Sequence, residues 1–183
     1  EVAESTLHAS GLLVTKSIYQ GEMAFDKSLL NIKSNKSRIR EIEYAVKNSM
    51  PIRVLLTGPP GTGKTAYAHA LAQDNDKPLI RISTSDVLSK YVGESEQQIS
   101  ALFQRACDEQ AILLFDEVDS LLANRQQLHA HHEVQLVNEL LAQLECNTQP
   151  VFAATNYADK LDHAVLRRFD IKLHCNYLTT QQS

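Results

Sequence analysis

The feature that most constrains this chain is a run of eight residues, Gly58-Pro59-Pro60-Gly61-Thr62-Gly63-Lys64-Thr65. A short apolar segment, Arg53–Thr57, precedes the run and has the character of a buried strand, and an alanine-rich helical segment, Lys64–Gln73, follows it. Glycines let the backbone wrap closely, so that consecutive N–H groups can face one anion at the start of a helix. The run therefore predicts a phosphate-binding loop between a strand and a helix.

The spacing of the run matches the Walker A pattern of nucleotide-binding proteins. In that pattern Lys64 reaches the β- and γ-phosphates of the nucleotide, and the Thr65 hydroxyl binds Mg²⁺. We expect the nucleotide to be held by the run and by the residue after it: Gly58, Pro59, Pro60, Gly61, Thr62, Gly63, Lys64, Thr65 and Ala66. The alternative is a glycine- and proline-rich turn that precedes a helix by chance, and the strand and helix on either side argue against it.

A second motif consists of an apolar strand, Ile112–Phe115, that ends in the adjacent acids Asp116 and Glu117. A carboxylate at a strand end can hold the hydration shell of Mg²⁺, so we assign Asp116, with Thr65, to the metal. Glu117 can act as the general base that polarises an attacking water. On an extended chain the two carboxylates would point in different directions. Acids that merely terminate a buried strand are the alternative, which the loop upstream disfavours.

Five short apolar segments predict strands, and helical patterns lie between them. Several of these segments are apolar without alternation, as expected for strands that are buried on both faces of a parallel sheet. This alternation predicts an α/β fold, in which ligands bind outside the carboxyl ends of the strands. The predicted strands are Arg53–Thr57, Leu79–Ser83, Ile112–Phe115, Val151–Thr155 and Ile171–His174.

The residues that make up the two motifs, and their order, resemble those of the AAA+ ATPases. The resemblance extends from about Phe25 to about Leu178. The resemblance implies a P-loop NTPase three-layer sandwich with a five-stranded parallel sheet in the order 5-1-4-3-2. It divides the chain into an N-terminal arm or linker, residues 1–21, and a nucleotide-binding α/β subdomain, residues 22–183. Members of the family continue into a small helical lid, which we do not expect here because the sequence ends at Ser183.

Two further segments resemble motifs of this family. Asn156 follows a predicted strand at the place of the residue that orients the attacking water, although it could also be a simple turn residue. Arg167 and Arg168 match arginines that reach the γ-phosphate held by a neighbouring subunit, or they form a helix-end pair that the helix dipole favours. The resemblance does not rank the two arginines.

The segment Tyr91-Val92-Gly93 resembles the pore loop of the protein-remodelling branch of the family, which includes katanin and spastin. In that branch an aromatic side chain grips a polypeptide that is threaded through a ring of subunits. The resemblance implies a ring oligomer and a polypeptide substrate. A buried tyrosine in a loop is the alternative for Tyr91.

Composition and minor motifs narrow the choice of function. A net charge of −4 gives no support to nucleic-acid binding, and no apolar run approaches the roughly 20 residues that span a bilayer. Three widely spaced cysteines indicate reduced thiols and a cytoplasmic location. The cluster His129, His131 and His132 lacks zinc-ligand spacing. Residues 156–159 mimic a guanine-reading motif, but no GTPase switch pattern accompanies them, so we expect ATP.

The sequence thus predicts an ATPase that uses Mg²⁺ and drives protein remodelling as a ring. Two alternatives stay open. One is a nucleic-acid motor or loader of the same fold, and the other is a nucleotide-gated scaffold that binds ATP without hydrolysing it.

Overall fold

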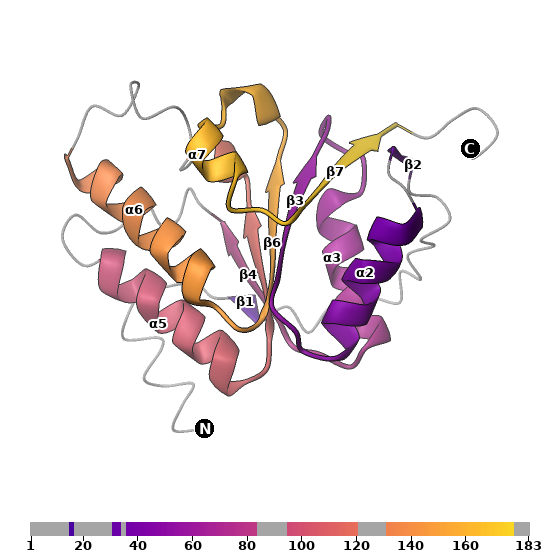
Figure 1. Ribbon diagram of the computed structural model, residues 1–183, viewed down its shortest axis with the longest axis horizontal. Coiled ribbons are helices and arrows are strands. Elements are labelled where there is room, and N and C mark those ends of the chain that lie inside the picture. Colours follow the sequence, from indigo (N-terminus) through magenta and orange to yellow (C-terminus); the bar gives the residue numbers. More distant parts are fainter. Residues whose placement is uncertain (1–14, 17–30, 34–35, 84–94, 121–130, 178–183) are drawn as a thin grey trace.

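The computed structural model describes residues 15–16, 31–33, 36–83, 95–120 and 131–177 (Figure 1). The strands are β1 (Thr15–Lys16), β2 (Asn31–Lys33), β3 (Ile52–Thr57), β4 (Leu79–Ser83), β5 (Ile112–Asp116), β6 (Pro150–Thr155) and β7 (Ile171–Asn176). The α-helices are α2 (Lys36–Lys47), α3 (Lys64–Asp74), α5 (Ser95–Asp108), α6 (His131–Cys146) and α7 (His163–Leu166). Two short 3₁₀ helices are η2 (Val118–Ser120) and η4 (Ala158–Lys160).

The described strands form one sheet in the order β1-β4-β5-β6-β3-β7-β2. Its five central strands run parallel to one another. These strands are the five that the sequence predicts, and their order, 5-1-4-3-2, is confirmed. Parallel neighbours need long crossovers, which contain α3, α5, α6 and α7 in turn.

The prediction of a purely parallel, five-stranded sheet is wrong. The sheet is mixed, because β1 pairs antiparallel with β4 at one edge and β2 pairs antiparallel with β7 at the other. These edge strands are only two and three residues long and partly polar, so they carry no apolar pattern that would reveal them. Short edge strands are a common way to protect a sheet from further pairing. Since β1 lies within the predicted arm or linker, the boundary at residue 21 stays a prediction.

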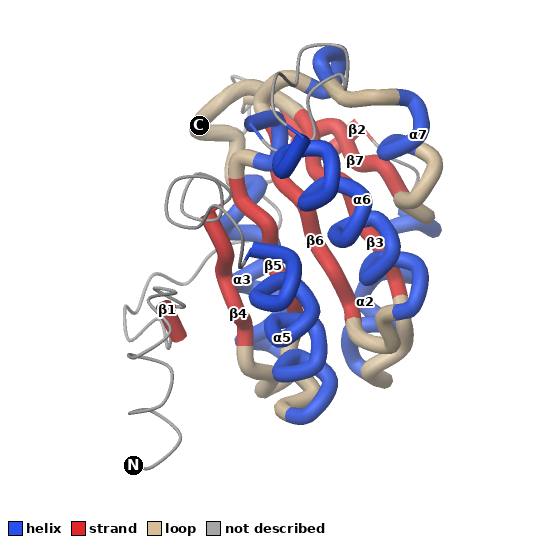
Figure 2. The backbone as a smooth tube through the Cα atoms, turned by 90° about the vertical axis from the view of Figure 1, so that its left-hand side faces the viewer, coloured by secondary structure: helices blue, strands red, loops and turns tan. Residues whose placement is uncertain are grey.

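Helices cover both faces of the sheet, as the predicted three-layer sandwich requires. The pair α5 and α6 packs on one face, and α2 and α3 pack on the other (Figure 1); Figure 2 shows α5 and α6 in front of the central strands. Successive residues of β3 serve opposite cores: Leu55 belongs to the α5–α6 side, whereas Val54 and Leu56 belong to the α2–α3 side. No helix in the described part of the chain is long and apolar enough to cross a membrane.

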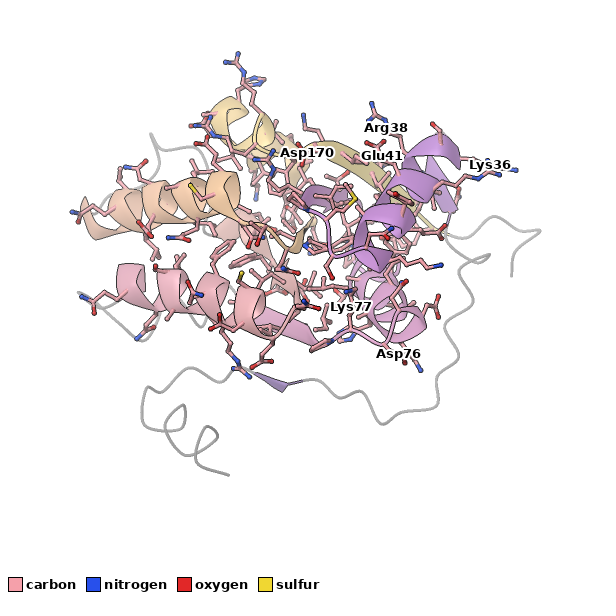
Figure 3. All side chains as sticks on the ribbon, turned by 60° about the horizontal axis from the view of Figure 1, so that its bottom comes forward. Lys36, Arg38, Glu41, Asp76, Lys77 and Asp170 are labelled. Atoms are coloured by element: carbon pink, nitrogen blue, oxygen red, sulfur yellow. The ribbon has the colours of Figure 1, made fainter. Side chains whose placement is uncertain are left out.

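An ion pair between Arg53 and Asp170 fixes the start of β7 beside β3. Arg53 Nη2 lies 2.8 Å from Asp170 Oδ1, and Arg53 Nε and its backbone N donate to Oδ2 at 3.0 and 2.9 Å. Burial opposes the charge, but the hydrogen bonds from Arg53 outweigh it and hold the pKa of Asp170 below its usual value. Figure 3 labels Asp170, which directly precedes β7. The pair stabilises the register of Val54 with Ile171 and hence the place of β7 beside the phosphate-binding loop.

The carboxyl ends of the central strands meet at one edge of the sheet, where ligands of such folds bind. The phosphate-binding loop follows β3, Asp116 ends β5, and Asn156 follows β6. The topology therefore gathers three of the predicted motifs at this edge.

Candidate functional site

The phosphate-binding loop joins β3 to α3 with three glycines at positive φ: Gly58 at 138°, Gly61 at 77° and Gly63 at 83°. Residues with side chains rarely adopt these angles, which explains the glycines. At Gly58 space is limiting as well, because a Cβ atom would lie 2.0 Å from the backbone oxygen of Cys175 in β7. The loop therefore sits directly against the backbone of the neighbouring strand.

Lys64, at the first position of α3, curls back over this loop. Its side chain is buried, and Nζ donates to the carbonyl oxygens of Gly58 and Pro59, both at 2.7 Å. Thr62 closes the same turn, since its hydroxyl donates to Pro59 O at 2.8 Å. Burial lowers the pKa of Lys64, although the negative charges of Asp116 and Asp119 act in the opposite direction. The ammonium group is thus held inside the loop, where a phosphate would offer a stronger acceptor than the two carbonyls.

The two predicted metal ligands are in contact. Thr65 Oγ1 donates to Asp116 Oδ2 at 3.2 Å, which joins the start of α3 to the end of β5. Hydroxyl and carboxylate oxygens are the hard donors that Mg²⁺ prefers. The residues present therefore fit a Mg²⁺ ion at this point.

Arg81 is a member of this cluster that the sequence prediction missed. Its Nε and Nη2 atoms donate to the same Asp116 Oδ2 at 3.1 and 2.6 Å. Arg81 pairs with Leu114 across the β4–β5 ladder, so it shares a face with Asp116, two residues further along β5. The sequence signal that could have revealed Arg81 is a charged residue in the middle of a largely apolar strand.

Glu117 corrects the expectation of an extended acidic pair. Its φ is 57°, in the left-handed region, and its backbone N–H donates to Asp116 Oδ1 at 3.1 Å. The chain therefore turns sharply after Asp116, and the Glu117 side chain is exposed. Backbone strain of this kind is often found at functional sites, where a side chain is directed away from the course of its strand.

Asn156 lies directly after β6, beside a small hydrogen-bonded group. The Thr155 hydroxyl donates to Asp119 Oδ1 at 2.9 Å and accepts from the backbone N–H of Tyr157 at 3.0 Å. These bonds connect the end of β6 to η2, which follows β5, and they fix the backbone on both sides of Asn156. Thr155 and Asp119 are buried or half-buried positioning groups that the sequence prediction did not single out.

The two predicted arginines differ in their surroundings. Arg167 directly follows α7 and is exposed; its backbone N–H donates to His163 O at 3.2 Å, but its side chain makes no hydrogen bond or ion pair within the described ranges. Arg168 is half-buried: its Nη1 donates to Ala164 O at 3.2 Å. Its Nε lies 2.6 Å from Glu145 Oε1 on α6 as an ion pair, although the N–H is not aligned for a hydrogen bond.

Other predicted sites lie outside the described residues. Tyr91, Val92 and Gly93 fall between β4 and α5, in the range 84–94, and His129 falls in 121–130. The side chains of His131 and His132 at the start of α6 are not described either.

The five central strands are parallel, a glycine-rich loop follows β3, and a threonine–aspartate contact lies at the carboxyl edge of these strands. These features define a P-loop nucleotide-binding domain. The family model described as "ATPase family associated with various cellular activities (AAA)" matches residues 54–177. The chain belongs to this AAA family.

Its relatives include a spastin homolog and a cell division cycle protein 48 homolog. The chain is 40% identical over 130 residues to a "Spastin homolog" of Caenorhabditis elegans, covering 67% of this chain and 25% of the relative. It is 41% identical over 127 residues to a "Cell division cycle protein 48 homolog" of Archaeoglobus fulgidus, covering 66% of this chain and 17% of the relative. The chain thus spans a quarter or less of these relatives.

Solved structures agree with this assignment. The FIGL-1 AAA domain in complex with ADP matches with a TM-score of 0.67 and 31% identity, over 82% of this chain and 55% of that chain. These relatives are consistent with the katanin- and spastin-like branch that the sequence resembles.

Proposed function

We propose that this chain binds ATP with Mg²⁺ and hydrolyses it to ADP and phosphate. The observation that carries the proposal is the contact of Thr65 with Asp116, which unites the phosphate-binding loop and the acidic strand end in one site. Family membership and the similarity to a domain that was solved with ADP support it.

The residues of the loop have separate roles in binding. The glycine backbone between β3 and α3 presents N–H groups to phosphate oxygens. Lys64 exchanges its two carbonyl partners for the β- and γ-phosphates, which form stronger, charge-assisted hydrogen bonds. When bound, Mg²⁺ would neutralise charge on the phosphates, and Thr65 and Asp116 would hold it.

Hydrolysis then needs a base and an oriented water. In our proposal Glu117 accepts a proton from the water while the water oxygen bonds to the γ-phosphorus. The bond between that phosphorus and the oxygen that bridges to the β-phosphate breaks, and ADP leaves. Asn156, on a backbone fixed by Thr155, orients the water.

We further propose that the hydrolysis drives protein remodelling in a cytoplasmic ring of subunits. Arg167 and Arg168 would act on the nucleotide of a neighbouring subunit, and Tyr91, Val92 and Gly93 would contact a polypeptide. Similarity to the spastin homolog and to the cell division cycle protein 48 homolog supports this role.

The catalytic part of the proposal is tested by ATP turnover and nucleotide binding in parallel. Glu117→Gln should lower turnover by about 10²–10⁴-fold and still bind nucleotide, because only proton transfer is removed. Lys64→Ala should lose both. Glu109→Gln is the matched control, since Glu109 directly follows α5 and pairs with Arg105, at the end of the helix that leads to the amino end of β5. Binding without turnover above the Glu117→Gln level would favour the scaffold instead.

The ring is tested by turnover against protein concentration. Specific activity should rise with concentration, and Arg167→Ala should abolish the rise, because an arginine supplied in trans is worth about 10³–10⁵-fold in P-loop enzymes. An activity independent of concentration would refute the shared site. Stimulation by an unfolded polypeptide supports remodelling, whereas stimulation by single-stranded DNA alone would favour the nucleic-acid motor.

A further inference from the structure

The Asp116 carboxylate accepts more hydrogen bonds than its role toward a metal would suggest. Its Oδ2 atom accepts from Thr65 Oγ1 and from both Nε and Nη2 of Arg81, and its Oδ1 atom accepts from the backbone of Glu117. A carboxylate oxygen offers about two lone-pair directions. Oδ2 is therefore saturated before any metal-bound water can donate to it.

Arg81 is the donor that can most easily leave. Thr65 and Glu117 are held by the backbone of α3 and by the turn after β5, whereas Arg81 reaches Asp116 with a long side chain that is 46% exposed. It is also the donor with a full positive charge, which a divalent cation repels.

The pair has a second effect on the site. Arg81 neutralises the Asp116 carboxylate that would otherwise repel the phosphates of a nucleotide bound without metal. The same side chain therefore favours metal-free nucleotide and disfavours metal, which couples the two ligands through one ion pair.

We propose that Arg81 is a built-in competitor of Mg²⁺ for Asp116, released when metal and nucleotide bind together. The inference rests on the proposed binding of a metal–nucleotide complex, and it assigns to β4 a residue that sets how strongly nucleotide affinity depends on Mg²⁺.

The test measures the affinity of the chain for fluorescent ADP by anisotropy, in EDTA and across a Mg²⁺ titration. In Arg81→Gln the Mg²⁺ concentration for half-maximal effect should fall by about tenfold or more, and affinity in EDTA should weaken. Arg81→Lys keeps the charge and should stay near the wild type. Arg38→Gln is the matched control, because Arg38 pairs with Glu41 on the surface of α2 (Figure 3).

Asp116→Asn separates competition from a merely structural role. In that background Arg81→Gln should no longer change the ratio of the affinities with and without Mg²⁺, because the shared carboxylate is gone. A purely structural Arg81 would weaken both affinities equally and leave their ratio unchanged, which would overturn the inference while nucleotide binding stands. Absence of nucleotide binding by the wild-type chain would overturn the proposed function and this inference together.

Discussion

Two glycines of the phosphate-binding loop have positive φ angles but different surroundings. Gly61, at 77°, has no described atom within 4 Å of the place where a Cβ would lie, so alanine there meets only backbone strain. Gly58, at 138°, would place its Cβ 2.0 Å from Cys175 O. A backbone oxygen of a paired strand cannot rotate away, so either the loop or β7 must move.

The two substitutions should therefore differ in stability. We expect Gly61→Ala to lower the free energy of unfolding by about 1–2 kcal/mol, the usual cost of left-handed backbone. Gly58→Ala should lower it by roughly 3 kcal/mol or more, because strain and a clash with β7 add. Urea unfolding without nucleotide measures both. Equal losses would show that the contact with Cys175 relaxes at no cost.

At the scale of the elements, Arg168 joins α7 to α6. Its Nε lies 2.6 Å from Glu145 Oε1, and its Nη1 donates to Ala164 O. Side-chain exposures of 34% and 51% mean that solvent screens the ion pair, so its contribution to stability is small. Arg167, one residue earlier, extends from the same helix end without such a partner in the described ranges. From this difference we propose that Arg167, rather than Arg168, acts on a neighbouring subunit.

A double-mutant cycle tests this division of roles. Arg168→Ala should lower the free energy of unfolding by about 1 kcal/mol, and most of that loss should vanish in a Glu145→Gln background. Arg167→Ala should change stability by less than about 0.5 kcal/mol and still reduce the concentration-dependent ATP turnover. The reverse pattern, with stability lost only in Arg167→Ala, would contradict the ranking.

The elements also show what local pattern can predict. Most central strands were predictable as apolar runs that are buried on both faces, as β5 and β6 are throughout, whereas β7 alternates between buried and exposed residues. The edge strands β1 and β2 were not, since their pairing depends on neighbours far away in the sequence. The two motifs predicted that Lys64, Thr65 and Asp116 lie in one site, because the carboxyl ends of parallel strands meet at one edge of the sheet.

The missed parts of the site depend on geometry that spacing does not encode. Arg81 meets Asp116 only through the register of β4 on β5, which pairs it with Leu114. The left-handed turn at Glu117 depends on its backbone bond to the side chain of Asp116. Asp119 accepts a hydrogen bond from Thr155 because η2 lies next to the end of β6.

At the scale of the whole molecule, the site connects separate parts of the sheet. Gly58 packs against Cys175 in β7, and Thr65 and Arg81 join α3 and β4 to Asp116 in β5. A ligand of the phosphate-binding loop should therefore stabilise the whole sheet. Cys175 reports on this connection, because it is 1% exposed and burial raises its pKa to about 11. Cys107 and Cys146 are exposed and serve as internal references.

Alkylation of the three cysteines, followed by peptide mass spectrometry, turns this connection into a measurement. Nucleotide at 100 times its dissociation constant stabilises the folded state by about 2.7 kcal/mol, so labelling of Cys175 that requires unfolding should slow by about 100-fold. Cys107 and Cys146 should react at unchanged rates, because they need no opening. Lys64→Ala should abolish the slowing. If nucleotide binds but Cys175 reacts as fast as before, β7 opens independently of the loop, and the contact between Gly58 and Cys175 does not carry the ligand's stabilisation across the sheet.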